Sequence, residues 1–202
     1  MLLEINPINP QLRLVEQVVK LLKGGAVICY PTDTGYGIGC DLMNQRAIKS
    51  IIQLKKRPKD KPFSFMCSDL TDISQYAHVS NTAYRLMKKS LPGPYTFVLP
   101  GTKLVPKVMA SKQKTVGIRV PAHPICRLLI ETLGNPIVNT SAQLENDEAP
   151  AEPFKIEQYL GNRIDLIIDA GPIYPDPSSV IDLTCDTPEV LRVGKGDVTP
   201  YR

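Results

Sequence analysis

Residues 26–41 read Ala-Val-Ile-Cys-Tyr-Pro-Thr-Asp-Thr-Gly-Tyr-Gly-Ile-Gly-Cys-Asp, an apolar run that changes at Pro31 into a glycine-rich stretch. The apolar part, residues 26–30, is typical of a short buried strand. We expect a loop over residues 32–41, because three glycines and little bulk follow the proline. A strand that ends in a polar loop is a common place for a ligand in an open α/β sheet.

The residues of this loop suit a ligand, although they also suit a plain turn. Glycines let the backbone approach a bound molecule, and Thr32 and Thr34 supply hydroxyl groups. A tight glycine turn with a structural Asp33 is an equally good interpretation. The stretch lacks the Gly-Lys-Ser/Thr ending of a P-loop, which excludes that class of phosphate site.

On both sides of this stretch, helical and strand patterns alternate early in the chain, and strands dominate late. The expected helices are one that starts at an Asn9-Pro10 cap and ends at Gly24-Gly25, Asn44–Lys56, two capped by Asp69 and Ser80, Pro124–Leu133, and Phe154–Leu160. The further expected strands are Phe63–Met66, Tyr95–Leu99, Thr115–Val120, Ile137–Asn139, Leu166–Asp169, Ser179–Leu183 and Val190–Val193. This order predicts an α/β protein with a mixed sheet and flanking helices.

The composition limits the class of protein. A chain of 202 residues suits one domain, here residues 1–202. Its formal net charge of +4 is too small to indicate nucleic-acid binding by itself, but it suits anionic substrates such as nucleotides. The five cysteines are scattered without metal-like spacing, and we expect buried thiols. With no signal-like start and no apolar run near the roughly 20 residues of a membrane span, we expect a cytoplasmic protein that does not enter a membrane.

The second candidate site is the basic segment 54–62, Leu-Lys-Lys-Arg-Pro-Lys-Asp-Lys-Pro, with five cations in seven residues. Cations suit the end of a helix, so solvated lysines there would need no ligand. Pro58 and Pro62 stiffen the segment, however, and a rigid turn would present Lys55 and Arg57 to a phosphate. Arginine offers a planar fork and lysine a point charge, a useful pair on a triphosphate.

Three further segments carry polar groups near strand ends. Arg119 lies in the apolar run Thr115–Val120, where it needs an anionic partner: either an acid of this chain or a ligand carboxylate. His123, before Pro124, fits a turn or cap better than a base. The runs Asn-Thr-Ser-Ala-Gln (139–143) and Pro-Ser-Ser-Val-Ile-Asp (177–182), the latter followed by Arg192, are unspecific when taken singly.

Seven segments in this order resemble the YrdC/YciO family of L-threonylcarbamoyladenylate synthases, from about residue 10 to residue 198. They are PTDTGYGIGCD (31–41), Lys55-x-Arg57-Pro58, SLPGPYTFVL (90–99), VGIRVPAHP (116–124), NTSAQ (139–143), PSSVIDLT (177–184) and VLRVGKGDV (190–198). The resemblance implies a single YrdC-like domain, with a twisted mixed sheet and flanking helices around a large basic cavity.

The resemblance also implies an activity. The family joins L-threonine, bicarbonate and ATP into threonylcarbamoyl-AMP and pyrophosphate, for the t⁶A modification of tRNA. ATP is then a substrate, with Mg²⁺ carried by its phosphates. Lys55 and Arg57 would be catalytic and hold the triphosphate. The same resemblance places Thr34, Arg119, Thr140 and Ser178 on threonine, and Ser141, Gln143 and Arg192, with Lys55 and Arg57, on the nucleotide.

This chain departs from the family pattern at Gly35, Leu91, Tyr95 and Gln143, and it resembles the YciO branch in segments 63–70 and 194–198. We expect a monomer or weak dimer. The alternative function is a protein that binds double-stranded RNA or tRNA in the same basic cavity. The small net charge and the absence of tryptophan argue against a stacking platform for single strands.

Overall fold

The computed structural model describes residues 1–56, 63–109, 111, 113–143 and 149–202. Its helices are α1 (Leu12–Lys23), α2 (Gln45–Lys55), α3 (Leu70–Tyr76), α4 (Asn81–Ser90), α5 (Pro124–Leu133), α6 (Pro153–Leu160) and the 3₁₀ turn η1 (Thr199–Tyr201). Its strands are β1 (Leu2–Glu4), β2 (Ile28–Thr32), β3 (Gly35–Gly39), β4 (Ser64–Met66), β5 (Tyr95–Pro100), β6 (Thr115–Arg119), β7 (Ile137–Ser141), β8 (Leu166–Asp169), β9 (Ser179–Asp182) and β10 (Glu189–Arg192).

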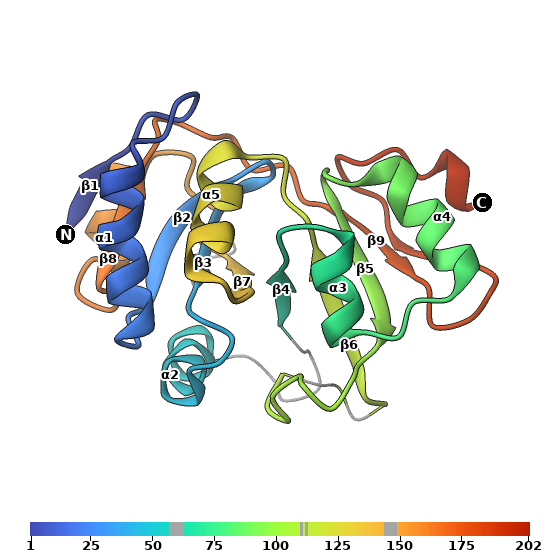
Figure 1. Cartoon of the computed structure of the whole chain (residues 1–202). Helices are drawn as coiled ribbons and strands as arrows, with labels where there is room; N and C mark the ends of the chain where they lie inside the picture. The colour runs from blue at the N-terminus through green and yellow to red at the C-terminus, as the bar shows by residue number, and fades with distance from the viewer. Residues whose placement is uncertain (57–62, 110, 112, 144–148) are drawn as a thin grey trace.

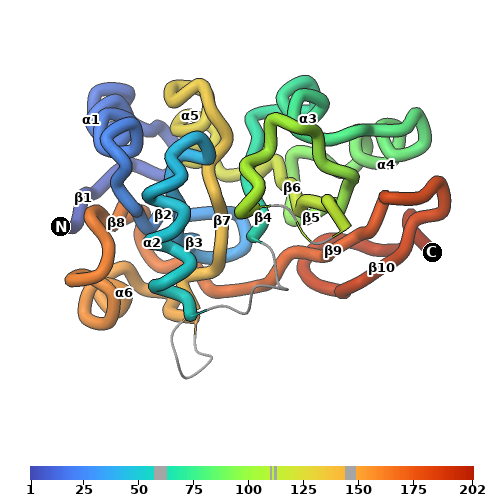
Figure 2. The backbone as a smooth tube through the Cα atoms, turned by 90° about the horizontal axis from the view of Figure 1, so that it is seen from below, coloured from blue at the N-terminus to red at the C-terminus, as the bar shows by residue number. Residues whose placement is uncertain are grey.

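The ten strands form one mixed sheet in the order β1-β8-β2-β3-β7-β4-β6-β5-β9-β10. Figure 1 shows α1 and α5 beside the half that holds β2 and β8, and α3 and α4 beside the half that holds β5 and β9. In Figure 2 these four helices lie along one side of the molecule, and α6 lies on the other. The expected α/β fold with a mixed sheet and flanking helices is confirmed.

Local sequence signals set most of the helix ends. Asn44, Asp69 and Ser80 each accept a hydrogen bond from a backbone N–H three residues later, as N-caps do. The expected cap at Asn9 is wrong: α1 begins after Gln11, and the Asn9 backbone N–H instead donates to Asn6. Gly24 ends this helix as expected.

The loop expected over residues 32–41 is wrong in its middle part, because residues 35–39 form strand β3 in an antiparallel hairpin with β2. Strand β2 also continues through Pro31 to Thr32. Glycine is rare in strands, and here close packing requires it. A Cβ atom on Gly37 would lie 2.6 Å from the side-chain oxygen of Asn139 on the neighbouring strand β7.

Two hydrophobic clusters fix the two sides of the sheet. Val15, Tyr30, Met66, Leu129 and Ile137 belong to the cluster beneath α1 and α5. The larger cluster holds the alternate side chains of the strands and residues of α2, α3, α4 and α6, and within it the ring of Phe65 packs edge-on against that of Tyr76. The alternation is the two-residue period of a strand, so any polar residue in step with Met66 and Ile137 lies on the α5 side.

Four of the five cysteines are buried, as expected, and Cys185 is exposed. Burial raises the pKa of the Cys29 and Cys126 thiols, which therefore stay protonated. Cys126 donates a hydrogen bond to the carbonyl oxygen of Pro31. Within the described ranges, no helix has the length and apolar character that a bilayer crossing requires.

Candidate functional site

A cavity of about 580 Å³ opens on the α5 side of the sheet, next to the strand residues that pack against that helix. Met66 and Ile137 lie in the apolar cluster with α5, and the next residues in step on their strands, Ser64 and Asn139, line the cavity. On β6, Gly117 and Arg119 line it for the same reason. The volume is typical of a site for a small molecule or cofactor.

Most of the predicted site residues meet in this cavity, although they come from distant parts of the chain. The predicted residues that line it are Thr34, Arg119, Thr140, Ser141, Gln143, Ser178 and Arg192. Lys55 reaches the strand that lines it, as described below. Arg57 lies outside the described residues, so its predicted role stays a prediction.

The register of the strands defines three levels along the cavity. Arg119 pairs with Met66 at the inner end, where its side chain reaches Asp33. Thr34, Ser178 and Arg192 line the same cavity. Ser64 pairs with both Gly117 and Asn139 at the middle row. Lys55, Ser141 and Gln143 form the outer end.

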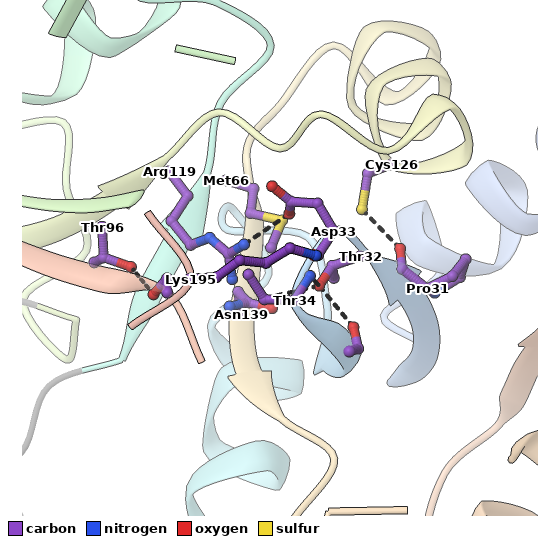
Figure 3. A network of polar contacts seen from close by, with 12 residues as sticks. Pro31, Thr32, Asp33, Thr34, Met66, Thr96, Arg119, Cys126, Asn139 and Lys195 are labelled. Atoms are coloured by element: carbon purple, nitrogen blue, oxygen red, sulfur yellow. Dashed lines mark hydrogen bonds and ion pairs between the residues drawn. The ribbon is translucent and has the colours of Figure 1, made fainter. Parts of the chain in front are cut away.

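At the inner end, Arg119 pairs with an acid of this chain. Its Nη2 atom donates to Oδ1 of Asp33 at 2.8 Å, and their side chains are 5% and 12% exposed. Figure 3 shows the two side chains facing each other, with Lys195 beside them. Lys195 donates to the backbone carbonyl of Asp33 at 2.7 Å. Of the two partners expected for Arg119, the acid of the chain is therefore present, and Arg119 still lines the cavity.

This ion pair leaves polar atoms for further contacts. Among the described residues, Oδ2 of Asp33 and Nε of Arg119 are buried without a hydrogen-bond partner. The same holds for Nδ1 of His123, at the N-cap position of α5. Burial lowers the pKa of His123 and the nearby Asp33 opposes that shift, so proximity to the acid does not make this histidine a strong base.

Arg192 is held by the residue that was expected to contact threonine. Its Nε atom donates to the backbone oxygen of Ser178 at 2.9 Å, and Nη2 donates to Oγ of Ser178 at 3.1 Å. That hydroxyl also shares a 2.8 Å hydrogen bond with Thr96, which the sequence reasoning missed. Arg119 and Arg192 line the same cavity, and burial, together with the nearby Arg119, lowers the pKa of the Arg192 guanidinium.

Lys55 is more than a solvated residue at the end of α2. Its ammonium group crosses to the end of β7 and donates to the backbone oxygens of Ser141 at 3.2 Å and Gln143 at 2.8 Å. The hydroxyl of Ser141 lies 3.4 Å from the side-chain oxygen of Gln143. The outer end therefore brings a cation and hydroxyl and amide groups together, which suits an anionic ligand.

The departures at Gly35 and Tyr95 have structural reasons. Gly35 has a φ of +117° and its missing Cβ would lie 3.3 Å from Cα of Pro175, so a branched residue would be strained there. The hydroxyl of Tyr95 donates to the backbone oxygen of Asp197 at 3.2 Å. This contact ties the start of β5 to the final segment 194–198.

These features define an α/β protein with a cavity on one face of a mixed sheet that two arginines and several hydroxyl residues line. A family model described as telomere recombination, that of the Sua5, YciO and YrdC proteins, matches residues 20–194. The chain belongs to this family, and the resemblance seen in the seven segments is confirmed.

Three similar proteins illustrate the relationship. An uncharacterized protein of Escherichia coli, YciO, is 45% identical over 199 residues, which are 98% of this chain and 97% of YciO. Its crystal structure matches with a TM-score of 0.96. A threonylcarbamoyl-AMP synthase of Coxiella burnetii is 33% identical over 89% of this chain and 96% of its own length. A crystal structure of Pyrococcus abyssi Sua5 with L-threonine matches with a TM-score of 0.90 at 30% identity, over 96% of this chain and 57% of Sua5.

Proposed function

We propose that this chain forms L-threonylcarbamoyl-AMP from L-threonine, bicarbonate and ATP, and that the product serves the t⁶A modification of tRNA. Relatives along nearly the whole chain are named threonylcarbamoyl-AMP synthase, and a related Sua5 binds L-threonine. The observation that carries the proposal is the cavity itself. Arg119 and Arg192 line it together with neutral polar groups, and Lys55 lies against its outer end, on the backbone oxygens of Ser141 and Gln143.

The chemistry balances without a further reactant. The threonine amine bonds to the bicarbonate carbon and a water molecule leaves, which gives a carbamate. A carbamate oxygen then bonds to the α-phosphorus of ATP, and the bond from that phosphorus to the bridging oxygen breaks. Pyrophosphate leaves with the electron pair. Because the carbamate is a weak nucleophile and both partners are anionic, catalysis here consists of positioning and charge neutralisation.

The inner end is assigned to threonine. Its carboxylate would bind at Arg119, beside the Asp33 pair, where Nε of the arginine is buried without a partner among the described residues. Thr34 and Thr140 line the same cavity and offer hydroxyls to the amino acid. Ser178 is assigned to threonine as well, while it also holds Arg192.

The outer end is assigned to the nucleotide. Lys55, with the predicted help of Arg57, would hold the triphosphate and stabilise the pyrophosphate as it leaves. Ser141, Gln143 and Arg192 complete the predicted nucleotide contacts. The described residues contain no group of three or more His, Cys, Asp or Glu side chains arranged to hold a metal. The proposal places Mg²⁺ on the phosphates, where it would neutralise the developing charge.

The test is an assay of the purified protein with ATP, bicarbonate and L-threonine. We expect pyrophosphate release that requires all three, together with an AMP adduct that carries the threonine mass. Release that ignores threonine would mean that the substrate is another amine. Absent release, combined with RNA binding that weakens steeply with salt, would overturn the enzyme in favour of an RNA-binding protein.

A further inference from the structure

Asn139 occupies the middle row of the cavity, between the two cationic ends. Its side chain lines the cavity although the residue is only 8% exposed. Its strand pairs it with Ser64, which in turn pairs with Gly117. A buried amide in a ligand cavity requires hydrogen bonds, so the partners of its two polar atoms show what it can still offer.

One side of the amide is fixed by Tyr30. The tyrosine hydroxyl donates to Oδ1 of Asn139 at 3.0 Å, and the backbone oxygen of Val138 lies next to it at 3.3 Å. Burial raises the pKa of Tyr30 well above its usual value, so the hydroxyl keeps its proton and remains a donor. Because the amide oxygen faces the tyrosine, the amide nitrogen faces Ser64 and the cavity.

The amide nitrogen has only one, long contact. Nδ2 of Asn139 donates to Oγ of Ser64 at 3.5 Å, and this is its only hydrogen bond among the residues that the structure describes. Oγ of Ser64 donates in turn to the backbone oxygen of Asn139 at 3.3 Å. A weak contact of this length is easily exchanged for a ligand oxygen.

The neighbouring strand leaves space for this arrangement. Gly37 faces the amide, and a Cβ at that position would fall 2.6 Å from its oxygen. The glycine in β3 therefore lets the amide lie close to Tyr30, in a fixed position. A polar group held in this way reorganises little when a ligand binds.

We infer that Nδ2 of Asn139, assisted by Ser64, binds the carboxylate group of the carbamate that forms on the substrate amine. This inference rests on the proposed function. It names the residue that binds the carboxylate group derived from bicarbonate. Neither Lys55 nor Arg119 is required for this contact. Asn139 would act as an uncharged donor that orients the attacking carbamate oxygen. A cation in its place would neutralise more of the negative charge on that oxygen.

The spacing of the strand supports this position. Asn139 lies two residues from both Ile137, at the level of Arg119, and Ser141, at the level of Lys55. Two residues of a strand span about 7 Å. A threonine held by its carboxylate at Arg119 carries its carbamate carbon three bonds further along. Three bonds span about 4 Å, so that carbon lies short of the level of Asn139, and a carbamate oxygen beyond it comes within hydrogen-bond reach of Nδ2. The outer end, where the α-phosphate would enter, lies further along.

The decisive variant is Asn139→Asp. Aspartate has the same shape and still accepts the Tyr30 hydrogen bond, but it replaces the donor by an anion that repels a carbamate. We expect the apparent KM for bicarbonate to rise, or turnover to fall, at least about tenfold, which corresponds to the loss of one good hydrogen bond. ATP affinity, measured by calorimetry, should stay within about twofold, since no strong donor to the nucleotide is lost.

Asn44→Asp is the matched control, because it makes the same chemical change at the N-cap of α2, where aspartate caps equally well. If the apparent KM for bicarbonate and the turnover of Asn139→Asp match those of this control, the inference is overturned. A parallel loss of ATP affinity would also overturn it, because Asn139 would then serve the nucleotide or the fold.

A binding experiment separates this inference from the proposed function. Threonine is titrated into the wild-type protein with and without bicarbonate, in the absence of ATP. Tighter binding with bicarbonate that disappears in Asn139→Asp supports the inference even if the protein releases no pyrophosphate. If bicarbonate has no effect on the wild type, or the same effect on the variant, the inference is wrong, whatever the turnover assay shows.

Tyr30→Phe gives a second and independent measurement. The ring remains and the hydroxyl is lost, so the amide is free to turn while the charge of the cavity stays the same. We expect the bicarbonate-dependent step to slow by about two- to fivefold, as for one hydrogen bond removed from a positioning residue. An unchanged bicarbonate dependence in a folded Tyr30→Phe protein would show that the tyrosine does not orient Asn139.

Discussion

At the inner end of the cavity Arg119 is buried and paired with the carboxylate of Asp33, whereas at the outer end Lys55 is partly exposed and held by two backbone carbonyls. A buried arginine pays a large desolvation cost, which its acid offsets. A partly exposed lysine stays in contact with water, so its desolvation cost is smaller. The inner end is therefore a rigid site that is already balanced, and the outer end is an adaptable one. We expect the inner end to determine which amino acid binds. The outer end should determine how strongly the phosphates of ATP are held.

The largest expected effect comes from Arg119→Met, which leaves the carboxylate of Asp33 buried without its cation. We expect the free energy of unfolding to fall by about 3–5 kcal/mol, as for one partner removed from a buried ion pair. We expect kcat/KM for threonine to fall at least about 100-fold. Chemical denaturation and steady-state kinetics measure the two effects.

The double variant Arg119→Met with Asp33→Asn tests whether the two effects have one cause. Removal of both charges should restore most of the stability, because no unpaired charge remains. Activity should stay low if Arg119 also binds the substrate carboxylate. Recovery of both stability and activity would show that the pair serves the fold alone, and the assigned threonine site would be wrong.

The next effect is expected at the outer end. Lys55→Ala removes the ammonium group that donates to the backbone oxygens of Ser141 and Gln143. Turnover should fall at least about tenfold and ATP should bind more weakly, with little change in threonine affinity. Lys49→Ala, an exposed lysine on the same helix, is the matched control.

The same assay tests the predicted role of Arg57, through Arg57→Ala. If Lys55→Ala behaves like Lys49→Ala, Lys55 is a helix-end residue after all. If threonine affinity falls as much as ATP affinity, the division of the cavity into two ends is wrong.

A smaller effect is expected from Ser178→Ala at the inner end. The change removes the hydroxyl that holds Nη2 of Arg192 and bonds to Thr96. The backbone oxygen of residue 178 still accepts from Nε, so Arg192 should loosen without leaving the site. We expect kcat/KM to fall by about fivefold, because Arg192 loses one of its two hydrogen bonds to residue 178 and keeps the other.

Ser74→Ala, on an exposed turn of α3, is the control for Ser178→Ala. Rescue by Ser178→Thr would show that the hydroxyl positions Arg192. A variant that loses stability but keeps its kcat/KM would limit Ser178 to a structural role.

The sequence predicted the features of this molecule that depend on neighbours in the chain. The caps at Asn44, Asp69 and Ser80, and the stop at Gly134, follow from local hydrogen bonds and backbone preferences. The glycine-rich strand β3 was missed because glycine is rare in strands, and the close packing that requires Gly37 comes from the distant Asn139 on β7. Strand β1 was missed for the same kind of reason, because three residues at a sheet edge pair with the distant β8.

In the candidate site, too, the sequence predicted some residues and missed others. The motifs located Arg119, Ser178 and Lys55, since their residue types and spacing match a family pattern. The partners of these residues, Asp33, Thr96 and the carbonyls at the end of β7, lie 82 to 88 residues away along the chain. No local pattern indicates such contacts, because the sheet order creates them. Asn139 was noted only as part of a polar run, and its hydrogen bond to Tyr30 is what gives it a role.

The smallest effect, and the finest test of the outer end, is Gln143→Asn. This change shortens the side chain by one methylene at a position where the chain departs from the family pattern, while the backbone oxygen that Lys55 contacts stays in place. The present contact between the Ser141 hydroxyl and the Gln143 amide is long, at 3.4 Å, so its loss should weaken the fold little. We expect turnover with threonine to rise by up to about threefold, because a fraction of a hydrogen bond is at stake. Gln75→Asn, on the exposed side of α3, is the control. A rise confined to kcat would place the amide near the reacting phosphate, whereas a fall would mean that glutamine is the residue that fits the outer end of this cavity.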